Sequence, residues 1–157
     1  MISVDYCGYH THNPDSELIY RPTGTANYLF LLVLAPMTFR FPGRSALKVK
    51  SGACILYAPN QYQNYQADRE FFNSYVHFSC KHEIVDPYDI RQNEIFYPYN
   101  TEELNWLLKQ IYQEFLSQMT FSDTSPSRPV PGIYSHRTAS EYISPASGAA
   151  RTDAGEL

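Results

Sequence analysis

The chain has 157 residues and a formal net charge of −4 at pH 7, which is the size of one globular domain. Its 12 lysine and arginine residues are dispersed and its isoelectric point is about 5.7, so it lacks the basic patch that usually marks a nucleic-acid surface. The 3 cysteines are far apart and in no zinc-binding spacing, which predicts reduced thiols in a cytoplasmic protein, and the longest apolar run, residues 28–36, is too short to cross a membrane.

In chain order, residues 1–20 predict an irregular arm with one or two short strands, because residues 13–16 (Asn-Pro-Asp-Ser) are a turn signal. The continuous apolar run over 28–34 predicts a strand that is buried on both faces. Residues 38–41 alternate and end at Pro42-Gly43, which has the chemistry of a hairpin turn, and the alternation resumes over 46–50. Further strands are predicted after the break at Gly52, namely at 54–57, from 62 onward, at 71–80 and at 94–97. Many short strands between Gly, Pro and Asn turns predict a mainly β chain, a sandwich or a barrel.

From residue 101 the hydrophobic period becomes that of a helix. Apolar residues at helical spacing predict one amphipathic helix over 101–118: Leu104, Leu107, Leu108, Ile111, Tyr112 and Phe115. Asn100 and Glu103 have the spacing of an N-terminal capping pair. The apolar face can dock on the chain's own β domain or can also pair with a second subunit, and the pattern leaves both open. Residues 120–157 are rich in Pro and Ser, which predicts a disordered or loosely attached tail.

Four segments occur in a defined order: residues 21–24 (Arg-Pro-Thr-Gly), residues 49–59 (Val-Lys-Ser-Gly-Ala-Cys-Ile-Leu-Tyr-Ala-Pro), Tyr65, and residues 75–78 (Tyr-Val-His-Phe). Together they resemble the N-terminal sensor domain of AraC-type (AraC/XylS) bacterial transcription regulators, over residues 5–118. The resemblance implies a mainly β, cupin-like fold, that is, a double-stranded β-helix or jelly-roll barrel followed by at least one amphipathic helix. It divides the chain into an N-terminal arm (1–20), a sensor barrel (21–99), a dimerisation helix (100–119) and the tail (120–157).

The resemblance further implies a ligand pocket inside the barrel. Its ligand-binding residues would be Arg21, Tyr65, Asn73, Tyr75 and Cys7. A guanidinium offers a rigid fork of donors and an aromatic face can stack on a sugar ring, so we expect a small-molecule effector, with carbohydrate as one candidate class. The helix would make a homodimer through Leu104, Leu107, Leu108, Ile111 and Phe115.

The family's DNA-binding half, with its two helix-turn-helix units, is not in this sequence, and the Pro/Ser-rich tail stands where a second dimer helix is expected. We therefore predict that this chain alone binds no DNA, because it has no recognition helix for a major groove. We also predict that it is not an enzyme, needs no cofactor or metal, and does not associate with a membrane.

An alternative hypothesis starts from His10, His12 and Glu17, which have the spacing of a metal-binding cupin motif. It would make the chain a small metal-dependent enzyme. Two observations oppose it. The register set by Gly52 and Pro59 puts the ligand-bearing strand at 22–28, which has no histidine, and the histidine of the second cupin motif falls at Gln63. A third hypothesis, a carbohydrate-binding module without a regulatory role, uses the same pocket as the sensor.

Overall fold

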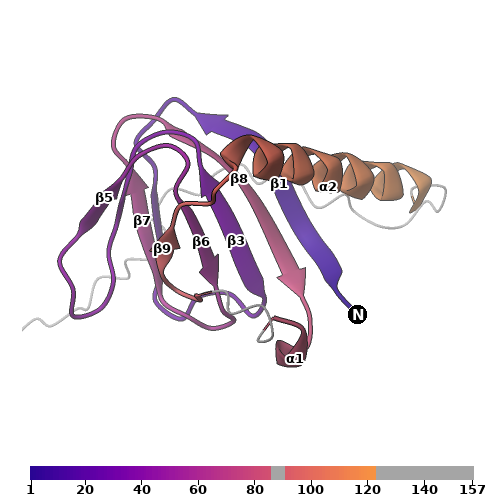
Figure 1. Cartoon of the computed structure of the whole chain (residues 1–157), viewed down its shortest axis with the longest axis horizontal. Coiled ribbons are helices and arrows are strands. Elements are labelled where there is room, and N and C mark those ends of the chain that lie inside the picture. The colour runs from indigo at the N-terminus through magenta and orange to yellow at the C-terminus, as the bar shows by residue number, and fades with distance from the viewer. Residues whose placement is uncertain (86–90, 123–157) are drawn as a thin grey trace, which may run out of the picture.

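In the computed structural model, which describes residues 1–85 and 91–122, two antiparallel sheets and one long helix make up the fold (Figure 1). The five-stranded sheet has the order β1 (Ser3–Asn13), β8 (Phe71–Ser79), β3 (Tyr28–Val33), β6 (Cys54–Tyr57) and β9 (Ile95–Phe96). The four-stranded sheet has the order β2 (Leu18–Arg21), β7 (Gln63–Ala67), β4 (Met37–Phe39) and β5 (Leu47–Val49). The helices are α1 (His82–Val85) and α2 (Thr101–Ser122). The prediction of a mainly β chain with a C-terminal amphipathic helix is confirmed.

The central strand β3 shows why its sequence is apolar without alternation. It pairs with β8 on one side and β6 on the other. Leu29, Leu31 and Val33 face the core between the sheets, whereas Leu32 lies in a second cluster on the opposite face of the same sheet. Both faces of β3 are therefore covered, as a continuous apolar strand requires.

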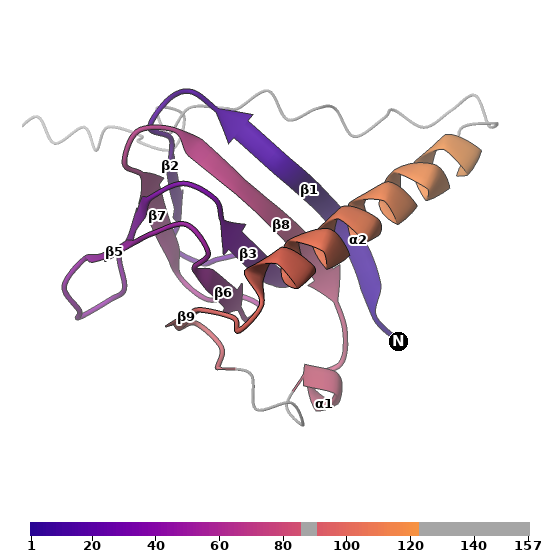
Figure 2. The same cartoon turned by 45° about the horizontal axis from the view of Figure 1, so that its top comes forward.

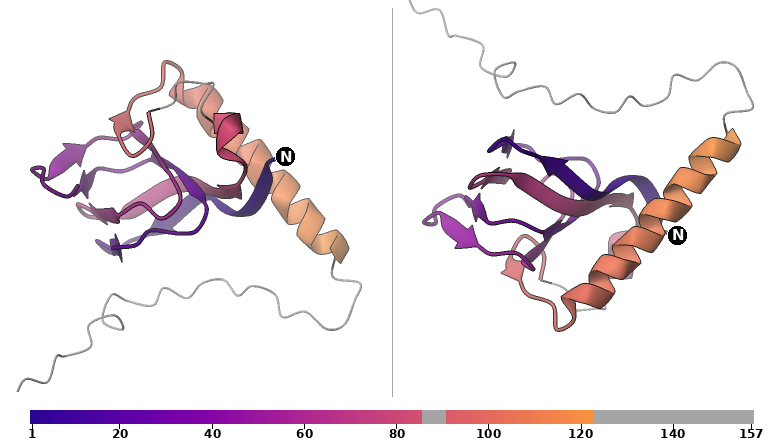
Figure 3. Two further views of the ribbon diagram at one scale, coloured as in Figure 1. Left: turned by 90° about the horizontal axis from the view of Figure 1, so that it is seen from below. Right: turned by 90° about the horizontal axis from the view of Figure 1, so that it is seen from above.

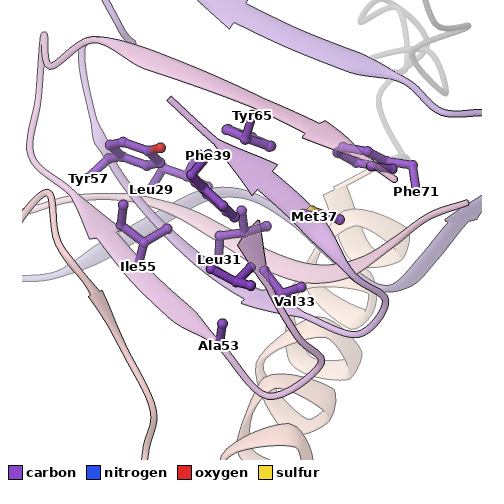
Figure 4. Close-up of a cluster of buried hydrophobic side chains, with 12 residues drawn as sticks. Leu29, Leu31, Val33, Met37, Phe39, Ala53, Ile55, Tyr57, Tyr65 and Phe71 are labelled. Atoms are coloured by element: carbon purple, nitrogen blue, oxygen red, sulfur yellow. The ribbon is translucent and has the colours of Figure 1, made fainter. Parts of the chain in front are cut away.

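The main core lies between the two sheets (Figure 4). Its side chains come from both sheets, and they are Leu29, Leu31, Val33, Met37, Phe39, Val49, Ala53, Ile55, Tyr57, Tyr65, Ala67 and Phe71. Tyr65 is at the centre of an aromatic stack, with ring centroids 5.2 Å from Phe39 and 6.2 Å from both Tyr57 and Phe71. Burial of each large apolar side chain contributes about 1.5–3 kcal/mol, so this stack holds the sheets together.

The N-terminal segment differs from the irregular arm that the sequence predicts. β1 pairs antiparallel with β8 along its length, with register shifts between Val4 and Tyr6 and between Gly8 and Thr11. The physical reason is that β8 would otherwise present a long unpaired edge, which β1 satisfies. The predicted turn at 13–16 is present, since Asp15 N donates to Asn13 Oδ1 at 3.1 Å between β1 and β2.

The helix α2 lies on the outer face of the five-stranded sheet, over β1 and β8, with its C-terminal end beyond the strands (Figure 2). Figure 3 shows that it lies on the side away from the four-stranded sheet. Glu103 N donates to Asn100 Oδ1 at 3.0 Å, so the predicted capping pair is present. Residues 120–122, assigned to the tail from the sequence, continue α2, and the rest of the predicted tail lies outside the described residues. No helix in the described ranges combines the length and the apolar character that crossing a bilayer requires.

Candidate ligand-binding site between the sheets

Alternate residues of β8 face the core between the sheets. Asn73 is paired with Val33 and Tyr75 with Leu31, and both partners belong to that core. Because paired residues on antiparallel strands share a face, Asn73 and Tyr75 lie on the inner side of the sheet. On β2, the half-buried Ile19 packs against the same core, so Arg21, two residues on, also points inward.

Arg21 brings a cation into this aromatic interior. Its Nη1 donates to Oε1 of Gln63, a fully buried side chain, at 3.0 Å. Among the described residues, no carboxylate lies within ion-pairing distance of Arg21. Its charge instead affects the pKa values of side chains on the opposite sheet. It lowers the pKa of His77, and it partly offsets the rise that burial causes in the pKa of Tyr57 and Tyr75. The remaining N–H groups of the guanidinium can therefore donate hydrogen bonds to a bound ligand.

Tyr57 supplies a buried polar group without a partner in the described part of the chain. It is only 1% exposed, and its hydroxyl has no hydrogen-bond partner in the described part of the chain. Burial strongly raises the pKa of Tyr57, so the group remains a neutral hydroxyl that can donate and accept. Burial also raises the pKa of Tyr65, to about 12. A buried polar atom without a partner lowers the stability of the fold by about 1–3 kcal/mol. The unpaired hydroxyl of Tyr57 is therefore a candidate for a hydrogen bond to a bound ligand.

A hydrogen-bonded network closes the same end of the core. His77 is 2% exposed, and its Nδ1 lies 2.9 Å from Oδ1 of Asn27. Asn27 donates through Nδ2 to Asp5 Oδ2 at 2.9 Å, so its oxygen is the acceptor for the His77 Nδ1–H. Burial, assisted by Arg21, lowers the pKa of His77 to about 3, which leaves the imidazole neutral. Tyr6 stacks on the ring at 4.0 Å, so β1 covers this end.

The structure brings four of the five predicted ligand residues to the core between the sheets. Tyr65 is in the aromatic stack, and Tyr75 packs against the same core. Asn73 lies further along, 1% exposed, and neither of its amide atoms has a hydrogen-bond partner in the described part of the chain.

Cys7, in contrast, lies on the other face of the five-stranded sheet. It is paired with Val76 in the cluster under α2, and burial raises the pKa of its thiol to about 11. The geometry therefore does not place Cys7 beside Arg21.

Several residues of this site were not assigned from the sequence, namely Tyr6, Tyr57, Gln63 and the paired Asn27 and His77. A signal was available for two of them. Tyr57 follows Ile55 at the period-two spacing of one strand face, and His77 follows Tyr75 in the same way. Tyr6 and Asn27 belong to segments whose pairing only the fold reveals.

The metal hypothesis requires His10, His12 and Glu17 to converge, and they do not. His12 Nε2 is 2.7 Å from Glu70 Oε2, Glu17 accepts from Asn13 Nδ2 at 3.3 Å, and His10 Nε2 is 3.2 Å from Asn105 Nδ2. Within the described ranges, no three His, Cys, Asp or Glu side chains gather where they could hold a metal ion.

The residues predicted for dimerisation have two different surroundings. Leu108 is buried against the chain's own sheet, and Leu104 and Ile111 pack on the same cluster. Leu107 is 45% exposed, and Phe115 is half-buried. Trp106, which the sequence analysis did not single out, is 57% exposed.

No family model matches the chain, and no curated protein matches it. Among solved structures, the crystal structure of unsaturated fatty acid-bound ToxT from Vibrio cholerae is similar, with 10% identity and a TM-score of 0.40 over 78% of this chain and 53% of that chain. A second ToxT structure has 11% identity and a TM-score of 0.36, over 75% of this chain and 56% of that one. The chain thus spans about half the length of these structures.

Proposed function

We propose that the chain is the effector-binding domain of an AraC-type transcription regulator, and that a small molecule binds between the sheets at Arg21. The observation that supports this most is the inward-facing Arg21, without a carboxylate partner among the described residues, in the same core as the unpaired hydroxyl of Tyr57. The order of sequence segments described above points to the same family. In this proposal residues 21–99 are the cupin-like sensor barrel, residues 1–20 respond to the effector, and residues 100–119 form the dimerisation helix.

The chemistry of the site indicates the class of ligand. Arg21 offers several N–H donors in a fixed fork, Tyr57 offers a hydroxyl, and Tyr65 offers an aromatic ring. His77 is neutral because burial lowers its pKa, so Arg21 carries the positive charge there. A compact molecule rich in hydroxyl or carboxylate oxygens, such as a sugar or a sugar acid, fits these groups. Asn73, deeper in the core, would contact the far end of a longer ligand.

Binding would be transmitted through β1, which lies between the site and α2. On its inner face Tyr6 stacks on His77, and on the helix side His10 and Tyr9 contact Asn105 of α2. A ligand that displaces Tyr6 would change the packing of β1, and with it the position of α2. The effector must bind the two β1 arrangements with different affinity, since only that difference can shift the equilibrium. In a protein with a DNA-binding half, this shift would alter how that half is presented.

We also propose that α2 mediates a homodimer, through Leu107 and Phe115 with the addition of Trp106. The remaining predicted residues, Leu104, Leu108 and Ile111, contact the chain's own sheet and would support the interface from behind. Sedimentation velocity over a range of protein concentrations tests this. Leu107→Ser should shift the distribution to monomer while the chain remains folded, and an unchanged dimer in that variant would refute the assignment.

The function is tested by thermal unfolding of the whole chain in the presence of a panel of sugars, sugar acids and small carboxylates. A ligand at 100 times its dissociation constant stabilises a protein by about 2.7 kcal/mol, which is a clear shift in melting temperature. Arg21→Met should abolish that shift, whereas Arg44→Met, an exposed arginine in the β4–β5 connection, should keep it. If the shift survives in Arg21→Met, the ligand binds elsewhere and the proposed site is wrong.

A further inference from the structure

A large cavity lies outside the core between the sheets, on the opposite face of the five-stranded sheet. Its volume is about 640 Å³, within the range typical of small-molecule sites. The sheet forms its floor and α2 one of its walls, with Val4, Phe30, Val76 and Leu107 among the lining side chains. Figure 2 shows α2 crossing over β1 and β8 on this face of the sheet.

Among the described residues that line this cavity, one side chain is charged and the others are apolar. That side chain is Arg91, and the other described lining residues are aliphatic or phenylalanine. The Arg91 side chain is 80% exposed, and its Nη1 is 3.8 Å from Oε2 of Glu94, a long contact at the surface. Exposed ion pairs of this kind contribute 0–1 kcal/mol, so the guanidinium can exchange Glu94 for another anion at little cost.

These two features together specify an amphiphile. A sugar would lose its hydrogen bonds to water against walls that cannot replace them, at a cost of about 1–3 kcal/mol per group. A peptide strand or loop would bring backbone N–H and C=O groups against the same walls with the same penalty. A linear alkyl chain has no such groups, and each methylene that it buries contributes about 0.8 kcal/mol.

We propose that the cavity under α2 binds a linear aliphatic molecule with an anionic head group, with the alkyl chain against β3, β6, β8 and α2 and the head group at Arg91. This is a second site, separate from the proposed effector site at Arg21, because the two lie on opposite faces of the sheet. Since Leu104, Leu107, Leu108 and Ile111 of α2 all line it, occupancy would be linked to the position of that helix.

Isothermal titration of the whole chain with sodium octanoate, decanoate and dodecanoate, below their micelle concentrations, tests the aliphatic part. Affinity should rise about fourfold per added methylene, which is 0.8 kcal/mol converted to a ratio. Leu107→Trp should weaken dodecanoate binding by tenfold or more, because the larger ring fills the cavity. Leu107→Glu is a second variant at the same exposed position, and its charge should weaken binding as strongly. Affinity independent of chain length, or binding that is unchanged in both folded variants, would overturn the proposal.

The head group is tested by comparing dodecanoate with dodecanol. The acid should bind about fivefold more tightly than the alcohol, as an exposed charge pair of 1 kcal/mol provides. Arg91→Gln should remove this preference, while Arg44→Gln should retain it. Arg21→Met should leave dodecanoate binding unchanged, which separates this site from the proposed effector site. Equal preference for the acid in wild type and Arg91→Gln would refute the role of Arg91.

Discussion

The buried hydroxyl of Tyr57 allows a sharp test of the effector site without any ligand. In Tyr57→Phe the ring, its volume and its contacts with Tyr65 are kept, and only the unpaired oxygen is removed. Because that oxygen is buried without a hydrogen bond, we expect Tyr57→Phe to raise the free energy of unfolding by about 1–3 kcal/mol. At the size of the described domain, each kcal/mol corresponds to a melting temperature higher by roughly 4 °C.

The matched control is Tyr62→Phe, which removes the same atom from a paired hydroxyl. Tyr62 accepts a hydrogen bond from Asn64 Nδ2 at 2.8 Å, so its loss leaves that amide donor unpaired. We expect a decrease in stability of about 1 kcal/mol. Urea unfolding at pH 7, with the m-value compared between variants, measures both changes. A loss of stability in Tyr57→Phe as large as that in Tyr62→Phe would show that the Tyr57 hydroxyl is satisfied, and would refute the reasoning.

Three further predictions concern β1, α2 and the buried histidine. Because the pKa of His77 is lowered to about 3, the unfolded chain takes up a proton below pH 6.5 that the folded chain does not. Stability should therefore fall by about 2 kcal/mol from pH 7 to pH 5, and His77→Gln should lose that part of the decrease in urea titrations at the two pH values. Leu108→Ala removes a buried side chain under α2 and should lower the free energy of unfolding by about 2–5 kcal/mol in the same assay. A decrease of less than about 1 kcal/mol would mean that α2 is not docked as described. In Gly8→Ala the added Cβ would lie 2.5 Å from the ring of Tyr75, so we expect β1 to loosen and its amides to exchange faster, while unchanged exchange in β1 would contradict this packing.

The parts of the fold that local chemistry determines could be predicted from the sequence. The apolar run at 28–34 became β3, and the aromatic run at 71–80 became β8, because each has a strong pattern of its own. The cap at Asn100 placed the start of α2 for the same reason.

The parts that depend on long-range pairing could not be predicted. The sequence of β1 predicts at most short strands, and its full length as one strand comes from pairing with the edge of β8, more than fifty residues away in the chain. The face of the sheet on which the Cys7 side chain lies also depends on that pairing, since a one-residue change of register turns every side chain to the other face. The cavity under α2 forms only when the helix is docked on the sheet, so no local sequence pattern predicts it.

The position of the bound effector tests the central proposal most directly. We would record amide spectra of the isotope-labelled chain with and without the first compound that stabilises it. The proposal predicts that the perturbed amides gather around Arg21, Tyr57, Gln63 and the facing part of β1. Perturbation limited to the surface of α2 or to the β4–β5 connection, with the signals around Arg21 unchanged, would contradict an effector site between the sheets.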